Sequence, residues 1–332
     1  MASMYQGAPP GPPGPPPPFD PELAEFAKVF RETWPSVTPA MIPLLREPAA
    51  LPRPTDEELA RDGAFTVETT SVPGPVDAPD VELLICRPTA ATAATPALYH
   101  LHGGGLFAGE ARFDIGALLT VATEFPLTVV AAEYRLAPET PHPGPVEDCY
   151  AGLVWTVEHA GELNIDPARI VLEGNSGGAG LAAAVALLAR DRGGPAILGQ
   201  MLLSPMLDDR NDNPSVAQLS SVALWDGTTN ATAWSALLGD ARGGPHVSPY
   251  AAAARATDLS KLPATFIDVG SVDIFRDEAV SYANRLWQAG NDTELHVWAG
   301  AFHGFEHALP QAALSRDAVA ARGRWLRRLL RG

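Results

Sequence analysis

Cysteine is scarce in this sequence, basic residues are outnumbered, and long apolar runs are missing. The 332 residues include two cysteines, Cys86 and Cys149, which are too few for a disulfide framework, so we expect two buried free thiols. Lys and Arg number 23 against 39 Asp and Glu, a net charge of −16. Without a basic stripe to neutralise phosphates, nucleic-acid binding is disfavoured. Because no apolar run is long enough to cross a bilayer, we also expect no membrane span.

The first sixty residues lack the features of a folded core. No charged segment followed by an apolar one marks a secretory signal, so we expect a cytoplasmic protein. Residues 1–18 are rich in Pro and Gly and predict a flexible or extended tail. Residues 19–62 hold three short helical patterns separated by proline-containing breaks. These patterns cover residues 21–31, 39–45 and 55–61.

Residues 63–332 predict an α/β core. The first two extended segments are rich in β-branched residues or alternate in polarity, which suits an antiparallel start to a sheet. Later apolar runs are short and alternate with helical patterns, as in a parallel sheet with both faces covered. The eight predicted strands cover residues 64–72, 81–87, 97–101, 128–132, 169–172, 198–203, 264–269 and 294–298. A final helix is expected over about 312–330.

One connection in this core is unusually long. About sixty residues separate the strands at 198–203 and 264–269 and contain two tryptophans, Trp225 and Trp234. A structureless loop of this length would be uncommon, so we expect an inserted helical cap at about 206–255. Its two helices are predicted near 216–224 and 230–238. Together with the N-terminal helices, the insertion could cover an active site.

The sharpest local signal is the pentapeptide Gly174-Asn175-Ser176-Gly177-Gly178. It follows a predicted strand and opens a predicted helix, the context that a nucleophile elbow requires. Such a turn strains the serine backbone and presents the hydroxyl at a helix N-terminus, where developing negative charge is favoured. A glycine-rich turn without chemistry is the alternative. A dinucleotide fingerprint starting at Gly178 is disfavoured, because residues 190–194 form a loop where an acidic strand end should lie.

A second glycine-rich segment, His102-Gly103-Gly104-Gly105, directly follows the strand at 97–101. Successive glycines allow the backbone N–H groups to converge on one point, as a hole for a tetrahedral oxyanion requires. A phosphate-binding loop would need a Lys and a Ser or Thr after the glycines, and these are missing. The segment therefore favours acyl-transfer chemistry.

A nucleophilic serine needs a general base and an acid that orients it. We predict His303 as the base, because it lies in a loop after the last strand, whereas His296 lies inside that strand and His307 on the next helical pattern. We predict Asp273 as the acid, because it follows the strand at 264–269, where parallel sheets place catalytic groups. The neighbouring Asp277 and Glu278 are interpreted as charges in the first turn of a helix.

These motifs together resemble the hormone-sensitive-lipase-like family of α/β-hydrolases, which includes bacterial esterases and carboxylesterases. The segment Glu133-Tyr-Arg-Leu-Ala-Pro-Glu139 is similar to a family motif, and the resemblance covers about residues 99–305. It implies an α/β-hydrolase fold with a mostly parallel eight-stranded sheet, flanking helices and a helical cap. It further implies an oxyanion hole formed by the N–H groups of Gly104, Gly105 and Gly177, with residues 134–139 as support, and no cofactor or metal.

Two features depart from the family pattern. The elbow usually reads Gly-Asp-Ser-Ala-Gly or Gly-Thr-Ser-Ala-Gly, whereas Asn175 and Gly177 stand at the variable places here. Glu173, an acidic residue at the end of a central strand, has no partner that the sequence identifies.

The predicted activity is hydrolysis of short- to medium-chain carboxylic esters through the triad Ser176, Asp273 and His303. The partner is then a small-molecule ester, and the resemblance leaves a homodimer open. An amidase or a lactonase could use the same triad, because the pocket decides the substrate. A non-catalytic ligand-binding protein on the same scaffold is the alternative outside enzymes.

Overall fold

The computed structural model describes residues 13–47 and 53–331. Residues 1–12 of the predicted flexible tail lie outside this range. Within the described part of the tail, the side-chain amide of Gln218 donates to the carbonyl of Pro15 at 3.1 Å. The end of the proline-rich segment therefore contacts the insertion.

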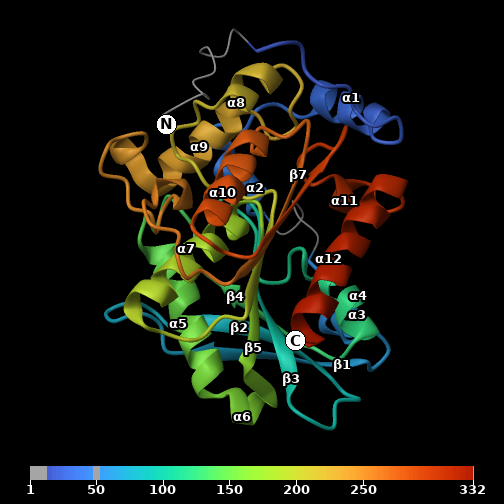
Figure 1. The fold of residues 1–332 in the computed structure, drawn as a ribbon, viewed down its shortest axis with the longest axis vertical. Helices are drawn as coiled ribbons and strands as arrows, with labels where there is room; N and C mark the ends of the chain where they lie inside the picture. The colour runs from blue at the N-terminus through green and yellow to red at the C-terminus, as the bar shows by residue number, and fades with distance from the viewer. Residues whose placement is uncertain (1–12, 48–52, 332) are drawn as a thin grey trace, which may run out of the picture.

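The core is an eight-stranded sheet with the order β1-β2-β4-β3-β5-β6-β7-β8 (Figure 1). Strand β2 pairs antiparallel with both β1 and β4, and the other neighbours pair in parallel. The predicted α/β-hydrolase sheet is thus confirmed. The strands are β1 (Phe65–Val72), β2 (Val81–Pro88), β3 (Thr95–Leu101), β4 (Thr128–Glu133), β5 (Ile165–Asn175), β6 (Gly199–Leu203), β7 (Ala264–Gly270) and β8 (Thr293–Trp298).

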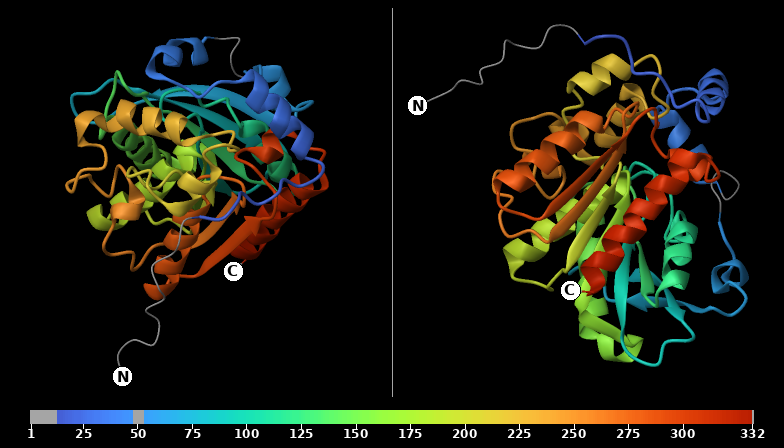
Figure 2. Two further views of the ribbon diagram at one scale, coloured as in Figure 1. Left: turned by 90° about the horizontal axis from the view of Figure 1, so that it is seen from above. Right: turned by 45° about the vertical axis from the view of Figure 1, so that its right-hand side comes forward.

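Helices cover both faces of the sheet, which explains why the central strands are continuously apolar. One face packs against α5 (Gly144–Glu158), α7 (Gly177–Arg192) and α10 (Arg276–Gln288). The other packs against α4 (Ile115–Glu124) and α12 (Ala313–Arg331), which lie side by side in Figures 1 and 2. Both cysteines are buried in this core and free, as predicted. The sheet ends therefore hold the loops of the site in fixed positions.

The remaining elements are short. They are α2 (Ile42–Leu45), α3 (Asp56–Ala60), α6 (Ala160–Leu163) and α11 (Phe305–Ala308), with 3-10 turns at Pro39–Met41, Gly239–Ala241 and Ala253–Arg255.

The long connection between β6 and β7 contains α8 (Pro214–Leu219) and α9 (Gly227–Leu238). The first of these helices starts two residues earlier than predicted, because Pro214 occupies its first turn and the Asn213 side chain caps it by accepting from the N–H of Val216. It also ends earlier, at Leu219 rather than at residue 224.

The N-terminal segment with α1 (Ala24–Thr33) hydrogen-bonds to this insertion. The guanidinium of Arg31 donates to the carbonyl of Ala223 at 2.9 Å. Val37 donates its N–H to the Thr229 hydroxyl at 3.0 Å, and the Thr232 hydroxyl donates to the Val37 carbonyl at 2.9 Å. Figure 1 shows α1, α8 and α9 at the same end of the molecule. Two segments distant in sequence thus form one hydrogen-bonded layer.

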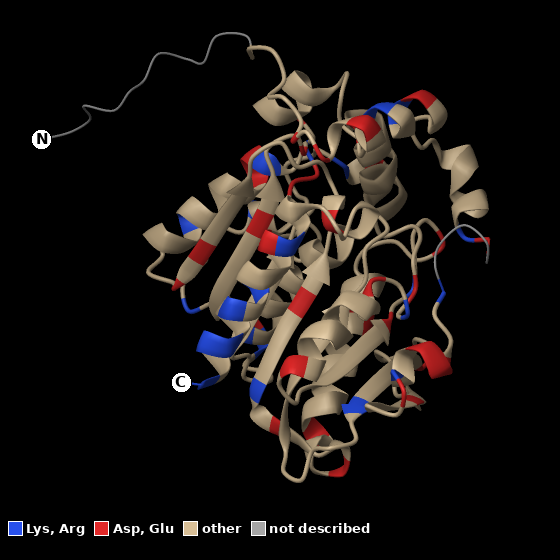
Figure 3. Ribbon diagram, turned by 90° about the vertical axis from the view of Figure 1, so that its right-hand side faces the viewer, with Lys and Arg blue, Asp and Glu red and all other residues tan. Residues whose placement is uncertain are grey.

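Charged residues of both signs are spread over many elements (Figure 3). Among the described helices, none combines the length and the apolar character needed to cross a bilayer.

Candidate active site

Ser176 occupies the sharp turn between β5 and α7. Its backbone has φ 57° and ψ −118°, a conformation that L-residues rarely adopt. The turn is fixed because the Ser176 N–H donates to the carbonyl of Leu203 at 2.8 Å, and its own carbonyl accepts from Gly180 and Met206 at 3.1 Å. A Cβ on Gly174 would lie 2.4 Å from the Gly178 carbonyl oxygen, so glycine is required there. The geometry is that of the predicted nucleophile elbow.

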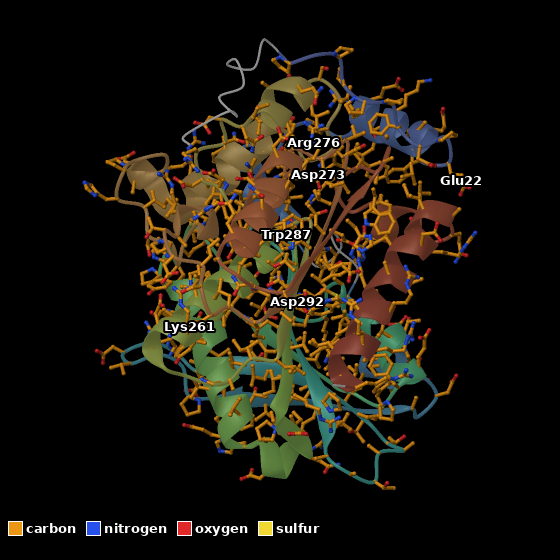
Figure 4. All side chains as sticks on the ribbon, in the orientation of Figure 1. Glu22, Lys261, Asp273, Arg276, Trp287 and Asp292 are labelled. Carbon is orange, nitrogen blue, oxygen red and sulfur yellow. The ribbon has the colours of Figure 1, made fainter. Side chains whose placement is uncertain are left out.

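The structure brings the three predicted triad residues together. The Nε2 atom of His303 lies 2.9 Å from the Oγ of Ser176, and its Nδ1 lies 2.8 Å from the Oδ2 of Asp273. The other Asp273 oxygen accepts from the N–H of Phe275 at 3.0 Å. Figure 4 labels Asp273 in the turn between β7 and α10. Asp273 and Ser176 are buried, so the chain of hydrogen bonds is largely shielded from water.

Aromatic rings hold the imidazole of His303 in place. Phe275 contacts it edge-on with ring centroids 5.2 Å apart, and Trp225 lies over it at 5.8 Å. Burial lowers the pKa of His303, but the charge and hydrogen bond of Asp273 raise it by a larger amount. The net pKa is therefore above the ordinary value of 6.5. The imidazole is therefore a stronger base than a free histidine.

The segment His102 to Gly105 lies against the elbow. Gly104 has φ +110°, and a Cβ there would lie 2.2 Å from the Ala108 carbonyl oxygen, so glycine is required. A Cβ on Gly177 would lie 3.2 Å from the backbone N of Gly105, which shows how closely the two loops approach. Among the described residues, no backbone acceptor pairs with the N–H of Gly104 or Gly105. These donors could therefore serve a bound oxyanion.

The segment from Tyr134 to Glu139 contacts this loop directly. The Tyr134 hydroxyl donates to the His102 carbonyl at 2.7 Å, and the two rings stack at 4.1 Å. The Ala137 N–H donates to the Leu106 carbonyl at 2.9 Å. Burial lowers the pKa of His102 to about 3, so its ring is neutral at physiological pH. These contacts agree with a supporting role for the segment.

A pocket of about 250 Å³ opens over Ser176 and His303. Its walls are largely aromatic and apolar. They are formed by α1 and the residue after it, by the loop that follows β3, and by the insertion. The lining residues include Phe30, Trp34, Phe107, Leu224 and Trp225. This lining is typical of a small-molecule site.

The other residues singled out in the sequence have different surroundings. The His296 ring is paired with Glu294 at 2.9 Å in β8, away from the triad. Asp277 pairs with Arg276 at 2.8 Å in the first turn of α10. Glu278 also lies in this first turn, as predicted, where it is buried and accepts from the N–H of Leu207 at 2.7 Å.

The two departures from the family pattern also have partners. Glu173 pairs with the Nδ1 of His100 at 2.5 Å, where β3 and β5 lie side by side. The Asn175 side-chain amide lies 3.1 Å from Asp114 and 3.0 Å from the Nε2 of His307. His307, which was predicted to lie on the helical pattern after His303, lines the catalytic pocket.

Sequence reasoning missed Trp225, Asp114 and His307 as residues of the pocket. Trp225 was noticed only as an aromatic residue in the insertion, and nothing local distinguished it from core. Asp114 precedes α4 without a motif. Its place beside the elbow depends on how the helix packs.

Within residues 13–47 and 53–331, no group of three or more His, Cys, Asp or Glu side chains is arranged to hold a metal ion.

Comparison with known proteins gave one family match and many relatives. A family model described as alpha/beta hydrolase fold matches residues 98–307. The chain is 34% identical to Esterase LipI of Mycobacterium tuberculosis over 237 residues, covering 69% of this chain and 73% of that protein. It is 32% identical to Carboxylesterase NlhH of the same species over 257 residues, covering 76% and 78%.

Solved structures of similar proteins cover nearly the whole chain. A bacterial heroin esterase is 38% identical with a TM-score of 0.86, and the match covers 95% of this chain and 98% of that one. Esterase LipW from Mycobacterium marinum is 32% identical with a TM-score of 0.80 and the same two coverages.

Proposed function

The chain belongs to the hormone-sensitive-lipase-like α/β-hydrolases, and from this premise we propose that it hydrolyses carboxylic esters through Ser176, His303 and Asp273. The observation that carries the proposal is the continuous hydrogen-bonded chain from Asp273 through His303 to Ser176, at 2.8 and 2.9 Å. Its relatives of similar length are named esterases.

The proposed reaction has two halves. Ser176 Oγ attacks the ester carbonyl while His303 Nε2 takes its proton, and Asp273 stabilises the resulting imidazolium. The tetrahedral oxyanion accepts hydrogen bonds from the N–H groups of Gly104, Gly105 and Gly177. Its collapse breaks the C–O bond, and His303 returns the proton to the leaving alcohol. Water then attacks the acyl-enzyme by the same steps and releases the acid.

Short- to medium-chain esters are the proposed substrates. The aromatic pocket would hold an apolar acyl or alcohol group by contact, while the site offers few polar side chains for its recognition. The N-terminal helices and the insertion at about 206–255 would act as a cap, because both supply pocket residues. We further propose that the protein is cytoplasmic and has no nucleic-acid partner. Cell fractionation tests the location, and sedimentation analysis shows whether a homodimer forms.

The triad is tested with Ser176→Ala. We expect turnover of p-nitrophenyl acetate and butyrate to fall by several orders of magnitude, and labelling by a fluorophosphonate probe to be lost. Ser220→Ala, at an exposed serine of the insertion, is the matched control and should keep both activities. Wild-type turnover by Ser176→Ala would refute the assignment.

A substrate panel tests the reaction class. The wild-type protein is assayed with p-nitrophenyl esters of increasing chain length, with one anilide and with one lactone. Ester hydrolysis should dominate. A higher kcat/KM on the anilide or the lactone would replace the esterase by an amidase or a lactonase, and a protein that is inert and unlabelled by the probe would be a binding protein.

A further inference from the structure

A second cavity lies directly behind the catalytic pocket. It is small, with a cavity volume of about 30 Å³, and lies between α4, α12 and the strands β5 and β6. Three residues line both spaces: Asp114, Asn175 and His307. These three side chains therefore form a shared wall between the pocket and the inner cavity.

Hydrogen bonds hold this wall together. The Asn175 amide nitrogen donates one hydrogen to Asp114 at 3.1 Å and the other to the Nε2 of His307 at 3.0 Å. An imidazole nitrogen that accepts carries no proton, so the His307 proton lies on Nδ1, which faces Asp114 at 3.6 Å. Each member of the wall is thus oriented by the other two.

The wall also stands close to the nucleophile. Asn175 immediately precedes Ser176 in the chain. A Cβ built on Gly103 would lie 3.7 Å from the Ser176 Cβ and 3.2 Å from the Asp114 carboxylate, so one small residue separates them. A group bonded to the serine oxygen and pointing inward would meet this wall first.

The inner cavity has the chemistry of a hydrocarbon site. Its remaining walls are mainly aliphatic, and the charged groups at its edge are already paired. Glu173 binds His100 at 2.5 Å, and Arg322 binds Asp268 at 2.8 Å and Glu306 at 2.7 Å. The aliphatic lining is formed by Ala117, Leu118, Val121, Met201, Leu203, Val319 and Leu326. A buried polar ligand would find few free partners there, whereas an alkyl chain needs none.

We propose that His307, oriented by Asn175 and Asp114, is a specificity residue that ends the acyl pocket and closes an apolar inner cavity to the acyl chain. The inference rests on the proposed esterase function and adds a limit on chain length. The imidazole fills the space through which an acyl tail would pass. Its removal joins the two cavities and lets longer tails extend into the aliphatic space.

The test is His307→Ala, assayed with p-nitrophenyl esters from acetate to dodecanoate. Relative to its own activity on acetate, the variant should hydrolyse long-chain esters better than the wild type does, so the chain-length optimum moves to longer acyl groups. Each methylene that enters the inner cavity should raise kcat/KM by about fourfold relative to wild type. His307→Gln keeps most of the side-chain volume and a hydrogen-bonding tip, so its profile should remain that of wild type.

A second variant fills the inner cavity from its far side. Ala117→Leu on α4 should leave the wild-type profile unchanged and should cancel the gain when it is combined with His307→Ala. An unchanged optimum in a folded, probe-labelled His307→Ala protein would overturn the proposal, as would an equal shift in His307→Gln. If the wild-type protein hydrolysed no ester at all, even acetate, the proposed esterase function itself would be refuted.

Discussion

His303 experiences opposing electrostatic influences, and their balance sets the pH range of the enzyme. Burial lowers its pKa, and the charge and hydrogen bond of Asp273 raise it by more, with smaller contributions from Glu306 and Asp114. The net pKa lies above 6.5. Below it the imidazolium cannot accept the serine proton, so kcat/KM for p-nitrophenyl butyrate should fall with decreasing pH, with an apparent pKa above 6.5.

Removing the orienting charge should change both rate and pH profile. We expect Asp273→Asn to lower kcat by about 10⁴-fold and to move the acidic limb of kcat/KM to lower pH. Asp277→Asn, four residues further on in a salt bridge with Arg276, is the matched control. If the acidic limb of kcat/KM had the same apparent pKa in wild type and Asp273→Asn, a group other than His303 would control the pH profile.

At the residue scale, the sequence predicted the triad but not the wall behind it. Ser176, Asp273 and His303 each lie in a short turn after an apolar strand, and parallel strands bring such turns to one edge of the sheet. Asp114 and His307 lie in segments without such a rule. Their contacts with Asn175 arise from how α4 and α11 pack, which local pattern does not encode.

At the scale of elements, strand positions were predicted well and helix limits less well. Strand β5 runs to Asn175, three residues beyond the prediction, because polar Glu173 broke the apolar pattern while its partner, His100, lies on β3. Glu278 was predicted in the first turn of a helix and lies there in α10, but its burial against the backbone at Leu207 was not predicted. Burial raises the pKa of Glu278 well above 4.5.

The junction between the N-terminal segment and α9 offers a test of the cap as an element. Val37 is buried, and its N–H and carbonyl bond the hydroxyls of Thr229 and Thr232. Replacing both threonines by valine removes two buried hydrogen bonds and leaves the Val37 groups unpaired, at a cost of about 1–3 kcal/mol each. We expect faster proteolytic cleavage within residues 24–45 and a higher KM with little change in kcat.

The control for this junction is Thr33→Val. The Thr33 hydroxyl bonds its own helix at the Val29 carbonyl and is exposed, so cleavage and KM should not change. Equal protection of the N-terminal segment in all three proteins would show that apolar packing alone holds the cap.

At the scale of the whole molecule, the order of elements was predictable because each buried strand is apolar and bounded by turn residues. The eight-stranded, mostly parallel sheet and the family assignment are confirmed. Tertiary ion pairs were not predictable. Arg322 is buried in α12 and links Asp268 of β7 to Glu306 of α11, and no local pattern in the sequence indicates this triplet.

This buried triplet connects β7, α11 and α12, so its loss should destabilise the whole fold. Arg322→Met leaves Asp268 and Glu306 buried without the guanidinium that joins them, and we expect the free energy of unfolding at pH 7 to fall by about 3–5 kcal/mol. Arg327→Met, on the same helix but paired with exposed Glu124, should cost less than about 1 kcal/mol. Denaturant unfolding at several pH values measures both.

The pH dependence of that loss follows from Glu306. Burial opposes its ionisation, but Arg322 and His307 lower its pKa to about 2, below the ordinary 4.5. Its contribution in the wild type is therefore complete above pH 4.5 and is lost as pH falls through about 2. In Arg322→Met the unpaired carboxyls take up protons at higher pH, so the difference between the proteins should shrink as pH falls from 7 toward 4. A difference that is constant over this range would show that Arg322 stabilises α12 by packing rather than by charge.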